Sequence, residues 1–340
     1  MRLSLNVRRT LAIVSAMTLL AGAAMLTAAA QTRTLRFVSP VRPPFTEVQG
    51  KPRFALDLVE EALKRVNITA TTTIVPSGEY GQLLLTGPYD GTAVGWPDSQ
   101  RQQEFLLSQP YLENRLVLVA RRGTDVSAKS MSALKGKRIA IINGYAYGDN
   151  FENSGPVFVR SNAEPDSLRM LLDNKVDYVL MDDLVVQYMV DEYPDEARTR
   201  LQIGLTPLVI RPVHMLIRKS VPDAASIIDG FNKQVRAMIT DRTYHKLLHV
   251  NWILADIDGD GKAEYIAAAD QAGKAQPARA YNLFTQDELD AAVQKDQERY
   301  FFGGAVYNGW SSVPDRYKTD YLDRPDAVHP TARIFTFSWK

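Results

Sequence analysis

The stretch that decides the fold lies at residues 90–111 and reads DGTAVGWPDSQRQQEFLLSQPY. Within it, Thr92–Val94 has the composition of a short buried strand. Asp98 is a residue type that caps helices, which predicts a helix running from there to Leu107. Just beyond, Leu116–Val119 is a continuous aliphatic run that predicts another buried strand. The stretch therefore predicts a strand, a helix and a strand in succession.

The same alternation continues on both sides of this stretch. Apolar residues at helical spacing predict helices over Ala55–Val66 and Ala224–Met238. Aliphatic or β-branched runs predict strands at Thr71–Val75, Arg138–Ile142 and Tyr178–Met181. Strands that alternate with helices indicate an α/β architecture with mostly parallel sheets. Further strands are expected at Leu35–Val38, Val157–Val159 and His214–Arg218, and further helices at Tyr80–Leu85, Pro165–Leu172 and Val185–Val190.

Length and composition limit the class of protein. The chain has 340 residues, enough for about two domains, and 45% of them are hydrophobic, which indicates a folded protein. The 40 Lys and Arg residues are balanced by 39 Asp and Glu, so nothing in the charge supports a nucleic-acid partner. The chain has no cysteine, which excludes disulfides, thiolate catalysis, Cys-ligated zinc and a lipid anchor on cysteine.

Residues 1–30 have the pattern of a secretory signal peptide. Arg2, Arg8 and Arg9 precede an uncharged apolar segment, and the small residues Ala28–Ala30 match a cleavage site. The alternative is an uncleaved membrane anchor, because the uncharged segment is long enough to span a bilayer. Cleavage near Ala30 removes three of the 40 basic residues and leaves 37 against 39 acidic ones. We then expect a soluble protein exported to a bacterial periplasm.

The end of the chain differs in composition from the rest. Ala267–Ala280 is rich in Ala, Gln, Gly and Pro and is predicted to be a linker. Thr285–Glu288 fits a capping box that begins a helix reaching about Tyr300. An aromatic-rich tail follows. We expect its rings to pack the tail onto the main body, and a binding platform for a sugar or a protein partner is the alternative.

A separate acidic motif, DIDGDGKAE, occupies residues 256–264. Its alternating aspartates offer hard oxygen ligands and Gly261 allows a tight turn, so we expect a structural Ca²⁺ here. The expected ligands are Asp256, Asp258, Asp260, the Lys262 carbonyl and Glu264. The motif is not a full EF-hand, because Ala267 stands at the twelfth position, and an acidic turn without metal is the alternative. His245 and His249 lie four residues apart on a predicted helix, but no third ligand supports a zinc site.

Several short motifs resemble those of the extracellular solute-binding proteins of family 3, the polar amino-acid receptors of ABC importers. In the stretch quoted first, Arg101, Ser108, Pro110 and Tyr111 fall at the family spacing. Leu107 stands there where Phe is usual. The other motifs are PPF at 43–45, LKGKRIAI at 134–141, GYA at 144–146 and NKVDYVLMD at 174–182. Together they extend over residues 35–252.

The resemblance implies a two-lobed α/β fold of the periplasmic binding protein type II kind, with a hinge and a solute held between the lobes. Lobe 1 would comprise about 33–120 and 215–252, and lobe 2 about 121–214. A C-terminal extension would occupy 253–340. The implied function is capture of a small polar, carboxylate-bearing, amino-acid-like solute for the membrane permease of an ABC importer, by a monomer and without catalysis.

The resemblance also implies the site residues. Arg101 would bind the solute carboxylate with two parallel hydrogen bonds, and otherwise it is a surface arginine of an ordinary helix. Asp182 or its neighbour Asp183 would bind an ammonium group, and otherwise Asp182 is a helix cap. Ala146 would offer a backbone N–H at a helix start. Further residues expected around the solute are Phe45, Trp96, Asp98 and Tyr145.

Besides Leu107, four positions depart from the family pattern. Asp98 stands where Thr is usual, Arg42 where an aromatic clamp is common, and Trp96 and Pro97 where small hydroxyl residues are usual. Trp96 therefore either stacks against the solute or fills space that a smaller solute does not need. These departures favour a small polar or zwitterionic solute over an amino acid in the strict sense.

Two other functions fit the same fold. A dehydratase-like enzyme would need a general acid or base in the cleft, for which Glu79, Asp98 and Glu152 are candidates. A periplasmic sensor subunit that reports to a membrane partner would have the same sequence features as an importer receptor.

Overall fold

The computed structural model describes residues 33–270, 272–277, 280–283 and 298–318. The expected signal peptide and most of the expected helix at 285–300 lie outside the described residues. From β1 to β10, most strands alternate with helices along the chain, which is typical of an α/β protein. None of the described helices is both long enough and apolar enough to cross a membrane.

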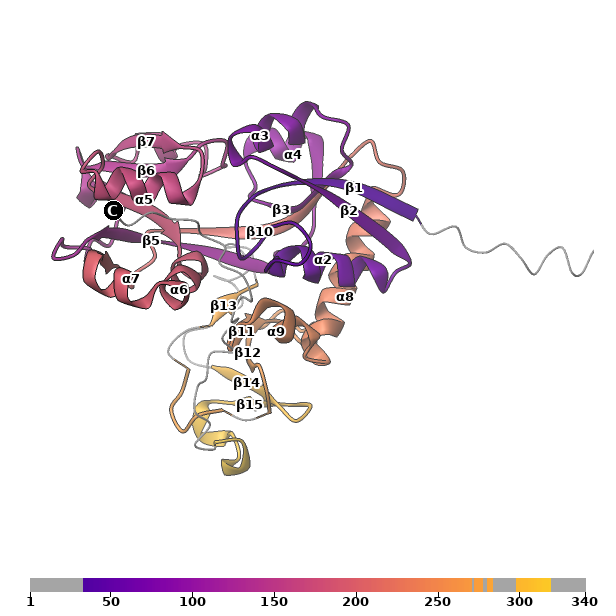
Figure 1. Cartoon of the computed structure of the whole chain (residues 1–340). Coiled ribbons are helices and arrows are strands. Elements are labelled where there is room, and N and C mark those ends of the chain that lie inside the picture. The colour runs from indigo at the N-terminus through magenta and orange to yellow at the C-terminus, as the bar shows by residue number, and fades with distance from the viewer. Residues whose placement is uncertain (1–32, 271, 278–279, 284–297, 319–340) are drawn as a thin grey trace, which may run out of the picture. The chain divides into compact units, whose positions relative to one another are not determined.

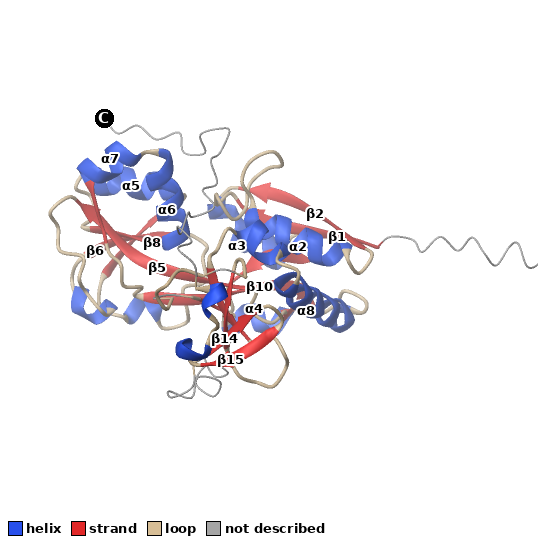
Figure 2. Ribbon diagram, turned by 90° about the horizontal axis from the view of Figure 1, so that it is seen from below, coloured by secondary structure: helices blue, strands red, loops and turns tan. Residues whose placement is uncertain are grey.

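Lobe 1 is a sheet with helices on both faces (Figure 2). Strand β1 pairs in parallel with β3 at Phe37 and Gly91, and β2 lies on the other side of β1. Successive residues of β1 enter different apolar layers, since Phe37 packs in the cluster that contains α2 and Val38 packs with Tyr80 of α3. The elements are β1 (Arg33–Pro40), α2 (Phe54–Lys64), β2 (Ile68–Val75), α3 (Ser77–Thr86), β3 (Gly91–Gly95) and α4 (Ser99–Glu104).

The expected helix from Asp98 to Leu107 is shorter than predicted. Helix α4 ends at Glu104, and Phe105–Leu107 forms strand β4, which pairs antiparallel with β10. The reason is the apolar run itself, because Phe105 is buried in one layer with Leu216 of β10. Pairing with an available strand satisfies the backbone of this run and buries its side chains at once.

Two long strands pass through both lobes and form the hinge (Figure 1). They are β5 (Leu112–Arg121) and β10 (Val209–Arg218), which pair antiparallel with each other. Residues 214–218 of β10 join β3 and β4 of lobe 1, whereas residues 116–119 of β5 join β8 of lobe 2. The chain therefore already lies in the lobe 2 sheet a few residues before the expected boundary at residue 120.

Lobe 2 is a second helix-covered sheet. Strand β6 pairs in parallel with β7 on one side and with β8 on the other, and β8 pairs antiparallel with β5. The strand β6 is aliphatic throughout its buried part, as expected for a strand covered on both faces. The elements are β6 (Arg138–Ile142), β7 (Val157–Ser161), α5 (Glu164–Leu172), β8 (Tyr178–Asp182), α6 (Asp183–Glu192), α7 (Pro194–Arg200) and β9 (Leu201–Ile203).

Two helices return the chain to lobe 1. The longer helix α8 (Ala224–Thr240) and the short α9 (Thr243–Leu248) both pack against α2. Helix α9 ends before His249, which has a left-handed backbone with φ of 53°. His249 is the C-cap of this helix, and its backbone N–H still donates to the His245 carbonyl at 2.9 Å, so the two histidines lie one turn apart at the end of α9.

The described part of the C-terminal extension contains a small sheet, and the described residues of the predicted linker after Ala267 form no helix or strand apart from an isolated bridge at Ala272. The strands of this sheet are ordered β13-β11-β12-β14-β15 among the described residues. Ala267, predicted as the start of a linker, ends β12, and Tyr300, predicted at a helix end, lies within β14. The strands are β11 (Trp252–Ala255), β12 (Glu264–Ala267), β13 (Tyr281–Asn282), β14 (Arg299–Phe302) and β15 (Ala305–Asn308).

The two faces of this sheet have different partners. Ile253 and Ile266 face the main apolar core, whereas Tyr300 and Phe302 form a separate cluster with Trp310 and other rings of the extension. The expectation that the aromatic residues would pack onto the main body is therefore wrong for this cluster. Strand alternation explains it, because neighbouring residues of one strand point to opposite faces.

Candidate functional site

The inter-lobe pocket is small and lined by side chains from both lobes. It encloses about 30 Å³ of free space, room for roughly two water molecules. Four of the expected site residues line it, namely Trp96, Arg101, Tyr145 and Ala146. The other lining residues are Pro40, Arg42, Thr46, Tyr80 and Val94.

Arg101 is buried at the start of α4, where the sequence motif directs it. The Asp98 side chain caps this helix and accepts a hydrogen bond from the Arg101 backbone N–H at 2.7 Å. The Arg101 guanidinium donates to the carbonyl oxygens of Trp96 at 2.9 Å and of Gly144, in lobe 2, at 3.4 Å. Its Nε lies 3.7 Å from Asp98. The alternative of an exposed surface arginine is wrong, since only 5% of Arg101 is accessible.

Arg42 is the second buried arginine of the inter-lobe pocket. It follows β1 in lobe 1, and its Nε lies 3.5 Å from a carboxylate oxygen of Glu164, the first residue of α5 in lobe 2. Its Nη1 donates to Asn114 Oδ1 on the hinge strand β5 at 3.1 Å. Burial lowers the pKa of Arg42, but the nearby Tyr145, Asp182 and Glu164 outweigh this and raise it overall. Arg42 therefore remains charged inside the closed structure.

Aromatic rings surround the Arg42 guanidinium. Its central carbon lies 5.1 Å from the centroid of Phe45, 5.2 Å from Trp96 and 5.3 Å from Tyr145. Trp96 contacts Tyr145 edge-on across the two lobes, and its indole N–H donates to Asn114 Oδ1 at 2.7 Å. The lobes therefore meet through the protein's own side chains. Of the expected residues, Phe45 reaches the pocket only through Arg42.

Asp182 ends β8 and caps α6, as the helix-cap alternative predicted. Its Oδ1 accepts from the backbone N–H groups of Leu184 at 3.0 Å and Val185 at 3.4 Å. The other oxygen, Oδ2, is buried without a hydrogen-bond partner among the described residues. Burial and the neighbouring Asp183 raise the pKa of Asp182 to about 7, and Arg42 opposes this. Asp182 is thus a buried carboxylate with one oxygen available, close to but outside the lining of the pocket.

The C-terminal extension contacts the hinge beside Asp182. The Tyr281 hydroxyl of β13 donates to Asp183 Oδ1 at 3.1 Å. The Arg115 guanidinium on β5 lies 4.3 Å from the Tyr281 ring and donates to the Ala280 carbonyl. Its Nε also bonds to Glu113 at 2.6 Å. Nothing local in the sequence signalled this contact.

Of the three candidates for a catalytic acid or base, Asp98 and Glu152 line a second pocket beside Tyr145 and Ala146, and each of the two has an arginine partner. Asp98 is engaged by Arg101, whereas Glu152 pairs with Arg160 and is exposed on the surface. Glu79 lies exposed in the first turn of α3.

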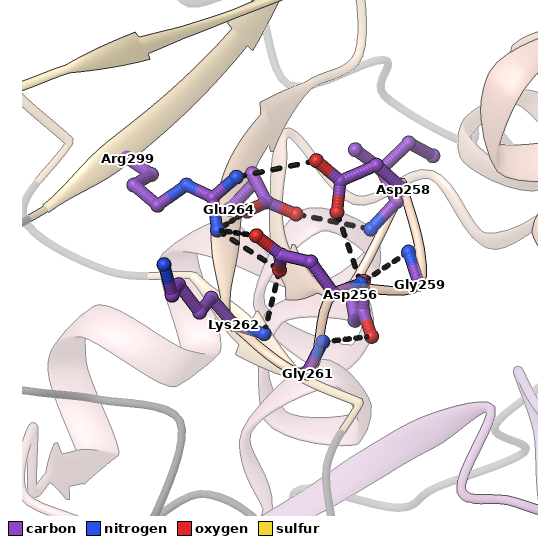
Figure 3. A network of polar contacts seen from close by, with 9 residues as sticks. Asp256, Asp258, Gly259, Gly261, Lys262, Glu264 and Arg299 are labelled. Carbon is purple, nitrogen blue, oxygen red and sulfur yellow. Dashed lines mark hydrogen bonds and ion pairs between the residues drawn. The ribbon is translucent and has the colours of Figure 1, made fainter.

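The acidic motif forms a compact loop between β11 and β12 (Figure 3). One carboxylate oxygen from each of Asp256, Asp258 and Asp260 can be chosen so that all three lie within 4.8 Å of one another. The same carboxylates accept backbone N–H groups of the loop, for example those of Gly259 at 2.6 Å and Gly261 at 2.9 Å. The geometry is that of a tight acidic turn with several oxygens directed inward.

Arg299 of β14 inserts its guanidinium into this loop (Figure 3). It bonds to Asp260 at 2.7 and 3.0 Å and to Asp258 at 3.2 Å, and lies 2.9 Å from Glu264 Oε1. Glu264 is inaccessible, and burial raises its pKa to about 7, opposed by the Ile257 N–H and Arg299. No pattern in the sequence indicated Arg299 as a member of this site, because it lies 39 residues beyond Asp260.

His245 is buried, and it belongs to no group of three potential metal ligands among the described residues. Its Nε2 lies 3.4 Å from the Ile266 carbonyl oxygen, and burial lowers its pKa to about 4. Among the described residues, the Asp256, Asp258 and Asp260 cluster is the single group of potential metal ligands that lies close enough together.

Comparison with known proteins identifies the family. Residues 37–255, well over half of the chain, match the bacterial extracellular solute-binding proteins, family 3. The chain belongs to this family. No curated protein sequence matches the chain.

Solved structures show the same fold. An ancestral arginine-binding protein bound to arginine is 23% identical, with a TM-score of 0.52 over 64% of this chain and 97% of that one. The P235GK mutant of ArgBP from T. maritima is also 23% identical, with a TM-score of 0.53 over 65% and 95%. The GluR0 ligand-binding core from Nostoc punctiforme, in complex with (L)-glutamate, is 19% identical, with a TM-score of 0.51 over 63% and 96%. The two-lobed solute-binding fold is therefore confirmed, and the C-terminal extension from residue 256 onward, which follows β11, lies beyond the family match.

Proposed function

We propose that this solute-binding protein captures a small zwitterionic, amino-acid-like solute and delivers it to an ABC importer. The observation that carries the proposal is Oδ2 of Asp182, which is buried without a hydrogen-bond partner among the described residues and lies close enough to Arg42 of the inter-lobe pocket for their charges to interact. A buried carboxylate oxygen without a donor is costly, and a solute ammonium would supply one. Arg101, buried in the neighbouring inter-lobe pocket, is the matching cation for a solute carboxylate.

When a solute binds, Arg101 exchanges one hydrogen-bond partner and Asp182 Oδ2 gains one. In the closed structure the Arg101 guanidinium bonds to two backbone carbonyls, one of them from each lobe. Opening the lobes breaks the bond to Gly144 and frees a donor for the carboxylate, which is a stronger acceptor because it is charged. An ammonium beside Asp182 favours its ionised form and lowers its raised pKa.

The test is a thermal-shift screen of small metabolites, followed by calorimetric titration of the best solute. Arg101→Ala should weaken binding by about tenfold to a hundredfold, because hydrogen bonds to charged groups contribute about 1.5–3 kcal/mol. Arg101→Lys should recover little, since an ammonium lacks the planar fork. Asp182→Asn should weaken binding only of a solute that carries an ammonium.

Arg218→Ala is the matched control. Arg218 stacks on Phe105 within lobe 1 and donates to the carbonyls of Leu84 and Leu85, away from the inter-lobe pocket. It should leave the affinity unchanged. A folded Arg101→Ala protein with wild-type affinity would refute the assignment of the carboxylate to Arg101.

The cellular setting is part of the same proposal. Membership of an extracellular solute-binding family is consistent with a periplasmic or extracellular location. We propose the periplasm, with a signal peptide cleaved near Ala30, a monomeric receptor and no catalysis. Intact mass of the exported protein tests the cleavage. A chain that keeps residues 1–30 in the membrane fraction would contradict it.

For the loop at residues 256–264 we propose Ca²⁺, with Arg299 as its competitor. The support is the set of three aspartate oxygens within 4.8 Å of one another, since Ca²⁺ takes hard oxygen ligands. Arg299 bonds to two of these aspartates, so Ca²⁺ must share or displace them. The affinity should therefore increase when Arg299 is removed.

A further inference from the structure

We infer that Arg42 sets the solute specificity of this protein by occupying part of the inter-lobe site with its own guanidinium, which excludes solutes with a cationic side chain. The inference rests on the proposed function in one respect, namely that the solute binds between the lobes. It adds the class of solute that the site rejects and the residue that rejects it.

The contacts of Arg42 are those that a bound cation would make. Phe45 and Trp96 come from lobe 1, Asn114 from the hinge, and Tyr145 and Glu164 from lobe 2. Arg42 can contact lobe 1, the hinge and lobe 2 at the same time only when the two lobes are closed. Arg42 therefore acts as a tethered occupant, because it supplies the interactions that a free cation would otherwise provide.

Three rings lie against the Arg42 guanidinium, its Nη1 donates to Asn114, and its Nε faces Glu164 at 3.5 Å without a hydrogen-bond partner among the described residues. Planar guanidinium groups stack on aromatic faces and form several directed hydrogen bonds at once, whereas an ammonium is a compact point charge. Glu164 is 8% exposed and Arg42 is 6% exposed by side chain, so the pair is withdrawn from water. Burying the Glu164 carboxylate is itself unfavourable, and a side chain that only filled space would not need it. The buried pair therefore indicates that the charge of Arg42 matters as well as its size.

Arg42 leaves little of the inter-lobe pocket for a solute. The remaining space of about 30 Å³ borders both Arg42 and Arg101. Two guanidinium groups at its wall repel a cationic side chain and favour an anionic group. A solute with a long cationic side chain would have to displace Arg42 from Glu164 and from the three rings.

The experiment opens the Arg42 site and offers it a free cation. The Arg42→Ala protein is titrated with methylguanidinium and with methylammonium, and binding is measured by calorimetry and by melting temperature. We expect methylguanidinium to bind this variant at least about tenfold more tightly than it binds the wild type, and more tightly than methylammonium does. Arg42→Met, which refills the space with an apolar chain, and Arg218→Ala, which removes a stacked arginine elsewhere, should show no such gain.

Two outcomes would overturn the inference. One is a folded Arg42→Ala protein that responds to methylguanidinium no more than Arg218→Ala does. The other needs no variant: wild-type protein that binds L-arginine in calorimetry would show that Arg42 does not exclude cationic side chains. The second measurement decides the matter if Arg42→Ala does not fold.

These probes separate this inference from the proposed function. Methylguanidinium reports on the space left by Arg42 and does not need Arg101, the proposed carboxylate-binding residue. A metabolite screen without a hit would therefore count against the proposed function and leave the methylguanidinium result intact. Conversely, a zwitterionic solute could depend on Arg101 as proposed while the Arg42→Ala protein gains no guanidinium binding.

Discussion

Two arginines of this chain, Arg42 and Arg299, lie among carboxylates where the sequence led us to expect an external ligand. Arg42 and its partner Glu164 are 6% and 8% exposed by side chain. Arg299 is 10% exposed, but its partners Asp258 and Asp260 are 44% and 37% exposed. The inter-lobe pair is therefore buried on both sides, whereas the loop pair is buried mainly on the arginine side.

This difference determines what each arginine contributes. Burying both charges of a pair costs desolvation free energy, which their mutual attraction offsets. Removing one of the two therefore leaves an uncompensated buried charge. Charges at the surface are solvated and screened, and their interaction contributes little. Arg42 should thus control whether the lobes close, while Arg299 chiefly fixes the position of a loop and the buried Glu264 beneath it.

The largest expected effect follows removal of Arg42. Arg42→Met leaves Glu164 and Asp182 buried without their cation and should reduce the free energy of unfolding by about 3–5 kcal/mol. Urea unfolding followed by tryptophan fluorescence measures it. The double variant Arg42→Met/Glu164→Leu should regain much of the loss, because apolar residues often replace a buried ion pair without cost. If Arg42→Met lowers the free energy of unfolding no more than Arg218→Ala does, the Arg42–Glu164 pair contributes no more than a surface ion pair.

The next effect concerns Asp182 and pH. Its folded-state pKa is raised to about 7, so the folded protein keeps a proton that the unfolded chain releases between about pH 4 and about pH 7. Stability from this group should therefore fall as pH rises through that window, by up to about 1.4 kcal/mol per pH unit. His245, with its pKa lowered to about 4, contributes the opposite slope below about pH 6.5.

The variant isolates Asp182 from the other titrating groups. Asp182→Asn keeps the shape of the side chain and cannot ionise. The stability of the wild type relative to this variant should therefore fall between about pH 5 and about pH 7. Melting temperatures of both proteins across this range give the difference. Parallel curves would mean that the Asp182 pKa is ordinary in the folded protein, and the case for an ammonium partner would weaken.

The sequence predicted the strands and helices of the molecule better than it predicted the ion pairs of Arg42 and Arg299. Strands such as Arg138–Ile142 and helices such as α8 have clear periodicity, and the structure has them at the expected places. Strand β4 was missed because its residues continue a helix-like segment, and only the neighbouring β10 makes a strand of them. The extension was misjudged for the same reason, since its short strands pair through contacts distant in sequence.

The candidate site divides in the same way. Motif spacing led to Trp96, Arg101, Tyr145 and Ala146, which the structure brings together in the inter-lobe pocket. Asn114, Glu164 and Arg299 were not found, because each acquires its role only when distant segments meet. Arg42 was noticed as a departure from the family pattern, but its partners come from three regions of the chain and could not be read from its neighbours in sequence.

A smaller effect is expected at the loop. Arg299→Met leaves the inaccessible Glu264 without its ion pair and should cost about 1–3 kcal/mol, the usual range for an unsatisfied buried polar group. Added Ca²⁺ should restore more stability to this variant than to the wild type, because binding to the folded state alone stabilises by mass action. Thermal unfolding with Ca²⁺ or with a chelator tests both points. Equal responses of the two proteins would remove Arg299 as a competitor for a cation.

The smallest effect is the response of the two pairs to salt. At about 1 M NaCl the Debye length falls to about 3 Å, so exposed charges are screened while buried ones are screened much less. The stability difference between wild type and Arg299→Met should therefore shrink with salt, since Asp258 and Asp260 are partly in water. The difference for Arg42→Met should stay nearly constant, because neither member of that pair is accessible to ions. Urea unfolding of the three proteins at low and high NaCl provides the comparison, with KCl as a check for specific ion effects. If the Arg42→Met difference shrinks as much as the Arg299→Met difference, the inter-lobe pair is open to solvent and the lobes separate readily without solute.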